Sequence, residues 1–109
     1  MQEIQYYLRA NGASPFEAWF SSLEAVARAK VARAIARLGQ GNRSSVKSVG
    51  HGVLEYRIDS GPGYRVYFGH DGEALVILLT GGTKRRQQRD IAEAAEFWTD
   101  YRRRKRRVR

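Results

Sequence analysis

The sequence contains no cysteine, only two prolines and two histidines, and no long apolar run. Without cysteine, neither a disulfide framework nor a thiolate metal site can form. The apolar runs are far shorter than the roughly 20 residues that span a membrane, and the first residues lack the apolar segment of a signal peptide. We therefore expect a soluble, cytoplasmic protein that has no membrane partner.

Acidic residues are also scarce, because 11 Asp+Glu oppose 20 Lys+Arg and give a formal net charge of +9. Seven of the basic residues lie in the final stretch "YRRRKRRVR", which has no acid. Residues 25–54 also lack acids but carry six basic side chains: Arg28, Lys30, Arg33, Arg37, Arg43 and Lys47. Clustered cations bind phosphate by counterion release, so this asymmetry predicts a polyanionic partner. A solvated helix face explains it about equally well.

The 109 residues, 42% of them hydrophobic, suffice for one small domain. We predict that residues 1–101 form this domain. Residues 102–109 are expected to form a disordered basic tail, because a block of like charges cannot bury enough surface to offset the entropy of ordering.

Hydrophobic periodicity predicts the elements of the N-terminal half. It indicates a strand over residues 4–8, a short helix from Pro15, a second helix over residues 23–38 and a loop over residues 42–52. Ser14 is the expected N-cap of the first helix, since Pro15 suits the first helical position and Glu17 completes a Ser-x-x-Glu capping box.

The C-terminal half alternates like a sheet. Strict alternation over residues 53–59 and 64–68, with a Gly-Pro-Gly turn between them, predicts a hairpin. The apolar run at residues 74–79 predicts an inner strand covered on both faces, and residues 84–101 predict a final helix. The expected fold class is α+β, in the order β-α-α-β-β-β-α, with helices packed against an antiparallel sheet.

Two arginines, Arg57 and Arg65, interrupt the apolar alternation on either side of the hairpin turn. If Ile58 faces Tyr64, the two arginines are directly opposite each other; a register shifted by two residues makes them diagonal. Like charges that lie this close destabilise a sheet, and an anion between them would reverse the sign of that effect. Alternatively, Glu55 and Asp59 neutralise them as surface ion pairs.

Residues 52–98 resemble the small toxins of the RelE/ParE superfamily, most closely the HigB-like group of addiction module killer proteins. The resemblance rests on a Glu-x-Arg motif, the segment Gly-Pro-Gly-Tyr-Arg-Val-Tyr-Phe, an apolar strand, Gly-Gly-x-Lys, and a helix that begins Asp-Ile-x-x-Ala. A lead-in of Lys47, Gly50 and Gly52 also matches. The arginine run at the C-terminus is not part of the pattern, and "TKRRQQRD" is more basic than usual.

The resemblance implies the toxin of a type II toxin-antitoxin system, an endoribonuclease that cuts messenger RNA, mostly on the ribosome, without a metal or other cofactor. Its expected partners are messenger RNA, the ribosome and a helix-turn-helix antitoxin similar to HigA. Arg57 and Arg65 would clamp the phosphate, and Lys84 and Lys47 would transfer protons or stabilise charge. The expected RNA contacts are Tyr67, which could stack on a base, and Arg43, Arg85, Arg86 and His51.

Several alternatives stay open at this point. The fold also suits a ParE-like toxin that inhibits DNA gyrase, or a catalytically silent relative that only binds an antitoxin. Lys84 and Lys47 are explained equally by solvation, and both histidines lie in or near turns, where most histidines are inert. The basic tail would be a tether to ribosomal RNA, a hook for an acidic antitoxin, or an extension without a role.

Overall fold

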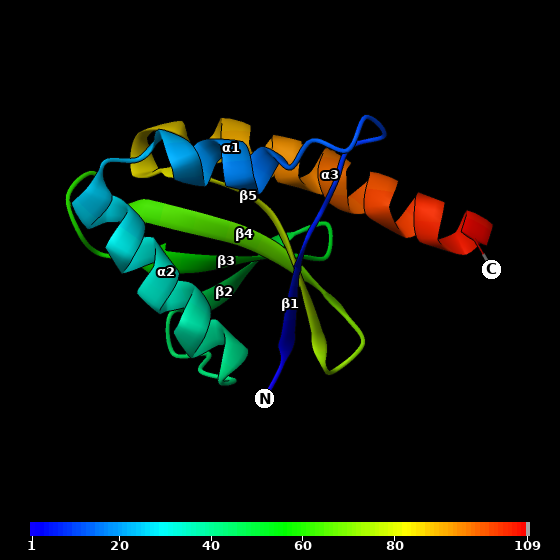
Figure 1. Cartoon of the computed structure of the whole chain (residues 1–109), viewed down its shortest axis with the longest axis horizontal. Helices are drawn as coiled ribbons and strands as arrows, with labels where there is room; N and C mark the ends of the chain where they lie inside the picture. Colours follow the sequence, from blue (N-terminus) through cyan, green and yellow to red (C-terminus); the bar gives the residue numbers. More distant parts are fainter. Residues whose placement is uncertain (109) are drawn as a thin grey trace.

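The computed structural model describes the backbone of residues 1–108 and the side chains through Lys105. It contains a five-stranded sheet, three α-helices and one short 3-10 helix (Figure 1). The strands are β1 (Glu3–Tyr6), β2 (Val46–Gly50), β3 (Val53–Ile58), β4 (Tyr64–Asp71) and β5 (Leu75–Thr83). The helices are α1 (Pro15–Ser22), α2 (Ala25–Gly39), η1 (Lys84–Arg86) and α3 (Gln87–Val108). The predicted α+β class is confirmed.

The sheet has the strand order β1-β5-β4-β3-β2. Strands β2 to β5 form an antiparallel meander, whereas β1 lies beside β5 in parallel, so the expectation of a purely antiparallel sheet is wrong for this one pair. The expected loop over residues 42–52 is also wrong in part, because Val46–Gly50 form β2. A register shift between Ser48 and Gly50 breaks the alternation there, which hides the strand in the sequence.

The helices cover both faces of the sheet. Successive residues of β4 alternate between two clusters of buried side chains: Val66 and Phe68 join the cluster under α1 and α2, and Tyr67 joins the cluster under α3. Ser14 caps α1 as predicted, since its side chain accepts a hydrogen bond of 3.0 Å from the backbone of Glu17.

Helix α3 approaches the sheet closely at a glycine of β4. The ring of Trp98 lies over Gly69, where an added Cβ would come within 2.6 Å of the ring. Trp98 also stacks on Tyr101 with ring centroids 5.4 Å apart. This close packing fixes the height of α3 above the strands that carry the candidate site.

Residues 102–108 continue α3, so the expected disorder of the tail is wrong for these residues; residue 109 lies outside the described part of the chain. Two carboxylates hold the extension. Asp100 accepts a hydrogen bond of 2.6 Å from the Tyr7 hydroxyl and pairs with Arg104. Asp71 accepts one of 2.5 Å from the Tyr101 hydroxyl and pairs with Lys105.

None of the helices within residues 1–108 is both long enough and apolar enough to cross a membrane.

Acidification should fray the end of α3 before the rest of the fold. Hydrogen bonds and ion pairs hold the pKa of Asp71 and of Asp100 below the ordinary value of 3.8. Each carboxylate therefore contributes stability that is present above its unfolded pKa and is lost as the pH falls through the lowered folded value, below about pH 4.

NMR chemical shifts of residues 101–105 should accordingly lose helical character between pH 5 and pH 2.5, while those of residues 91–95 keep it. The variant D71N/D100N should show the frayed state already at neutral pH. Helical shifts that persist at residues 101–105 under both conditions would contradict the role of the two carboxylates.

Candidate active site

Arg57 of β3 and Arg65 of β4 lie directly opposite each other. This is the predicted register in which Ile58 faces Tyr64. Residues that oppose each other in an antiparallel pair project from the same face. This is the face covered further along by α3, because Tyr67, two residues beyond Arg65, packs against that helix. The predicted pairing of the two arginines is confirmed.

The two arginines differ in exposure. Arg57 is exposed, and its Nε lies 3.4 Å from Oδ1 of the exposed Asp59. Arg65 is only 5% exposed, its Nε lies 4.0 Å from Oε2 of Glu55, and its Nη1 donates a hydrogen bond of 2.9 Å to the Gly63 carbonyl. Both arginines therefore have a carboxylate neighbour, as the alternative interpretation expected, but only the Arg57 pair is a surface pair.

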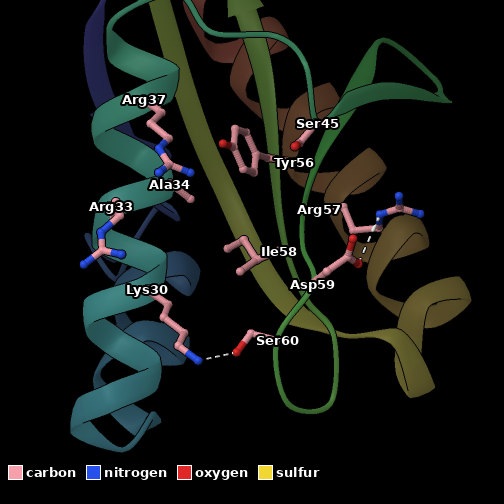
Figure 2. A pocket seen from close by; sticks show the side chains of 10 residues that line it. All are labelled: Lys30, Arg33, Ala34, Arg37, Ser45, Tyr56, Arg57, Ile58, Asp59 and Ser60. Carbon is pink, nitrogen blue, oxygen red and sulfur yellow. Dashed lines mark hydrogen bonds and ion pairs between the residues drawn. The ribbon is translucent and has the colours of Figure 1, made fainter.

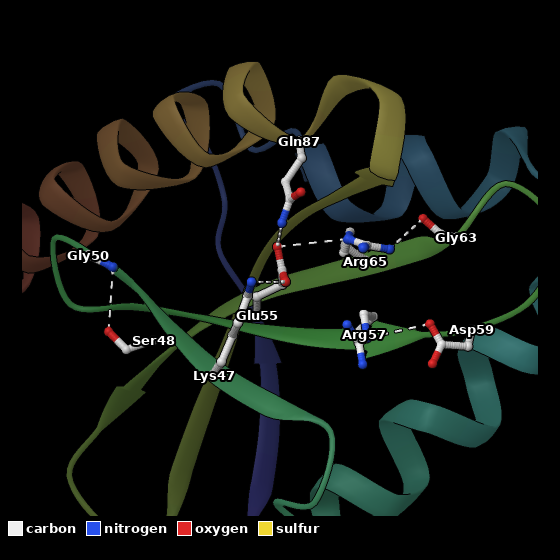
Figure 3. A network of polar contacts seen from close by, with 9 residues as sticks. All are labelled: Lys47, Ser48, Gly50, Glu55, Arg57, Asp59, Gly63, Arg65 and Gln87. Atoms are coloured by element: carbon white, nitrogen blue, oxygen red, sulfur yellow. Dashed lines mark hydrogen bonds and ion pairs between the residues drawn. The ribbon is translucent and has the colours of Figure 1, made fainter.

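Glu55 is the centre of the polar contacts in Figure 3. Its side chain is fully buried, and its Oε2 accepts a hydrogen bond of 2.8 Å from Nε2 of Gln87, in the first turn of α3. Its Oε1 lies 3.9 Å from Nζ of Lys47, which is on β2 and largely exposed. One carboxylate thus links β2, β3, β4 and α3, and it holds Lys47 and Arg65 on either side of itself.

Lys84 joins the same site through the backbone. The Gly63 carbonyl that accepts the hydrogen bond from Arg65 also accepts one of 2.8 Å from the backbone N–H of Lys84. Lys84, Arg85 and Arg86 form η1 directly after β5, and all three side chains are exposed. The structure therefore brings together Arg57, Arg65 and Lys84, with Lys47 attached through Glu55.

The prediction that Tyr67 stacks on a base is wrong for this structure. Its side chain is fully buried in the cluster under α3. Burial, together with the negative charges of Glu55 and Asp90, raises the pKa of the Tyr67 hydroxyl, which stays protonated. The same alternation that predicted a shared face with Arg65 does not reveal that α3 covers this part of the face.

Arg43 and His51 are not part of the cluster. Arg43 lies with the opposite cluster of side chains, where its guanidinium contacts Gln2 and His70 and lies over the ring of Phe68. Arg43 therefore lies outside this cluster, and its expected contact with RNA stays a prediction. His51 stands in the turn between β2 and β3, at the end of β3 that is remote from Arg57.

Asp90, the first residue of the Asp-Ile-x-x-Ala motif, is a buried residue of the site to which the sequence analysis assigned no role. Its carboxylate lies over Gly82, where an added Cβ would come within 1.8 Å of Oδ2, and Gly82 is the β5 neighbour of Arg65. Burial is the main cause that raises its pKa. A glycine within a strand often marks the close approach of another segment, so Gly82 near the end of β5 is the signal that could have suggested this contact.

A model of the phage-derived Gp49-like protein family (DUF891) matches residues 18–97. The chain belongs to this family. An uncharacterized protein of Haemophilus influenzae Rd is 48% identical to it over 80 residues, which cover 72% of this chain and 81% of the relative. The matched region includes α2, all of β2 to β5 and the start of α3, and thus every residue of the cluster around Glu55.

Four basic side chains meet in this arrangement, and clustered cations are chemically suited to bind an anion. Arg57 and Lys84 lie beside the buried Arg65, and Lys47 and Arg65 flank Glu55, whose Oε2 accepts a hydrogen bond from Gln87. A second buried carboxylate, Asp90, lies over Gly82. Within residues 1–105, no three His, Asp or Glu side chains lie together in a way that could hold a metal ion.

Replacing Glu55 should show that its carboxylate supports this site. Glu55→Ala leaves the Arg65 guanidinium buried without a carboxylate, which we expect to lower the free energy of unfolding by about 3 kcal/mol. Glu55→Gln retains a hydrogen-bond acceptor for Gln87 and should lose less. Urea unfolding at neutral pH measures both.

Asp59→Ala is the matched control, because it removes the other carboxylate neighbour of the two arginines. Its pair with Arg57 is exposed, so its loss should change the free energy of unfolding by less than about 1 kcal/mol. Equal losses for Glu55→Ala and Asp59→Ala would show that the buried carboxylate has no special role.

Proposed function

We propose that this protein is the toxin of a type II toxin-antitoxin system and cleaves messenger RNA without a metal. The observation that carries the proposal is the convergence of Arg57, Arg65 and Lys84 on one hairpin end, two of them through the same carbonyl oxygen. Membership of the phage-derived Gp49-like family and the sequence resemblance to HigB-like toxins support it. The cluster is a site for one phosphodiester group.

The chemistry follows from what RNA cleavage by its own 2′-hydroxyl requires. The 2′-oxygen loses its proton to water and forms a bond to phosphorus, the bond to the 5′-oxygen breaks, and that oxygen takes up a proton, which leaves a 2′,3′-cyclic phosphate and a 5′-hydroxyl. Negative charge accumulates on the non-bridging oxygens, and preorganised cations stabilise such charge strongly. Arg57 would bind these oxygens from the solvent side, while the buried Arg65, fixed by Glu55 and Gly63, would contribute a positive field beneath them.

The two lysines of the cluster would have different roles, and Lys84 would transfer the proton. Lys84 is exposed and begins at the carbonyl that also holds Arg65, so its ammonium can reach the same phosphate and protonate the leaving 5′-oxygen. Lys47, on the other side of Glu55, would stabilise charge, and Arg85 and Arg86 would contact flanking phosphates.

The expected partners follow from the same proposal. The ribosome would present the messenger RNA, and a helix-turn-helix antitoxin similar to HigA would neutralise the toxin. Co-expression of the adjacent reading frame tests the second partner, because its product should co-purify with this protein and relieve growth arrest.

Two exposed residues give the sharpest test of cleavage. Arg57→Ala and Lys84→Ala should each reduce messenger RNA cleavage by about 100-fold, since each removes one group that stabilises the transition state. Both side chains are exposed, so the fold should persist by circular dichroism. Arg65→Ala is less informative, because it leaves Glu55 buried without its arginine and changes stability as well.

Primer extension on messenger RNA after brief induction measures the cuts. Arg102 is an exposed arginine of α3, and Arg102→Ala is the matched control, which should cleave within about two-fold of the original protein. Undiminished cleavage by Arg57→Ala and Lys84→Ala would refute the proposed site. Inhibition of DNA gyrase in a supercoiling assay, without any cut, would replace it by the ParE-like alternative.

A further inference from the structure

A second group of cations lines a groove on the other side of β3. The groove lies between α2 and the β3–β4 hairpin and has a volume of about 410 Å³ (Figure 2), within the usual range of ligand sites. Lys30, Arg33 and Arg37 project from α2, and Arg57 and Asp59 from the strand side. Tyr56 and Ile58 point from β3 toward the helix and form an apolar floor.

The basic side chains of α2 that line the groove have no carboxylate partner within residues 1–105. Arg33 and Arg37 form no ion pair with any carboxylate of residues 1–105, and α2 itself has no acidic residue. Lys30 only donates a hydrogen bond to the Ser60 hydroxyl across the mouth of the groove. Like charges three and four residues apart destabilise a helix, and a bound anion would reverse that effect.

The spacing of these cations suits a chain of phosphates better than a single anion. Lys30 and Arg37 are seven residues apart on one helix face, which places their backbone positions about 10 Å apart along the axis. One strand of a DNA duplex carries a phosphate about every 3.4 Å of helix axis, and a length of about 10 Å therefore matches more than one phosphate of a nucleic-acid strand.

The groove meets the cluster around Arg65 at a free strand edge. The backbone N–H of Arg57 makes the last contact with the β2 side, a hydrogen bond of 3.0 Å to the Ser45 carbonyl, and β2 itself pairs no further than Tyr56. Beyond this point β3 continues for one residue, Ile58, which has no partner in β2. Arg57 lines the groove but directs its guanidinium away from α2, toward the other face (Figure 2).

We propose that this groove, lined by Lys30, Arg33, Arg37 and Arg57, is a second subsite that binds the phosphodiester backbone of single-stranded RNA next to the nucleotide held by Arg57 and Arg65. The strand passes around the free edge of β3, with Arg57 at the bend. The inference rests on the proposed function for the identity of the strand, but the binding itself does not require cleavage.

The test measures binding of a 12-nucleotide RNA in which every 2′-hydroxyl is methylated, so that no nucleophile for cleavage exists. R33E/R37E should weaken binding at least ten-fold at low salt. It should also reduce the slope of log affinity against log salt concentration by about 1.4, since each phosphate contact to a single strand contributes about 0.7. R33Q/R37Q should act in the same direction and guards against misfolding of the charge reversal.

The matched control is R9E/R28E, which makes the same change of formal charge away from the groove, since Arg28 lies on the opposite side of α2 from Arg33 and Arg37, and it should weaken binding less than two-fold. Equal losses in the two double variants would show that binding follows net charge, and would overturn the groove. A 12-residue polyglutamate that binds as tightly as the RNA and loses its affinity in R33E/R37E would assign the groove to an acidic polypeptide instead. Binding that fails in R33E/R37E while Arg57→Ala still cuts would keep the groove and refute only the proposed cleavage site.

Discussion

The candidate site depends on one buried carboxylate. Removing a charge from water is costly unless partners compensate, and Glu55 has three: Gln87, Lys47 and Arg65. Only Gln87 makes a hydrogen bond of ordinary length; the two cations lie at 3.9 and 4.0 Å, the outer limit of an ion pair. The carboxylate therefore holds its cations by their charge while leaving donor atoms unengaged, among them Nε of Arg65.

This pairing is looser than the bidentate contact that arginine and carboxylate often form, in which two N–H groups donate to the two carboxylate oxygens. Nη1 of Arg65 donates a hydrogen bond to the Gly63 carbonyl, whereas Nε of Arg65 faces Glu55 without forming a hydrogen bond. Catalytic contacts are often long in the absence of substrate, so the geometry is compatible with a site that tightens around an anion.

Local patterns predicted the hairpin and its arginines well, because the period of a strand and the chemistry of its turn are properties of adjacent residues. What the patterns could not supply is which part of a sheet face a distant helix covers. Arg57 and Tyr67 share a face, yet one is exposed and the other is buried under α3. The burial of Tyr67 follows from the packing of Trp98 on Gly69, a contact that no alternation encodes.

The prediction of a disordered basic tail was wrong for a related reason. Composition alone predicts disorder, but Asp71 and Asp100 lie where the last turns of α3 pass, and they bind Arg104 and Lys105. Strand β2 was missed because its bulge interrupts the period of two on which strand prediction depends. The first error reflects partners outside the window of residues that a pattern can compare. The second reflects an irregularity within that window.

The parallel pairing of β1 with β5 has a consequence for the order in which the chain folds. Glu3 pairs with Leu75, so the first strand to leave the ribosome must wait for nearly the whole chain before it acquires its neighbour. The neighbouring strands of the meander are joined by short turns, so each of their pairings can form sooner than the pairing of β1 with β5, because distant contacts are slow to close. The β3–β4 hairpin, which bears Arg57 and Arg65, thus belongs to the part of the protein that is able to fold first, and the N-terminal strand is added last.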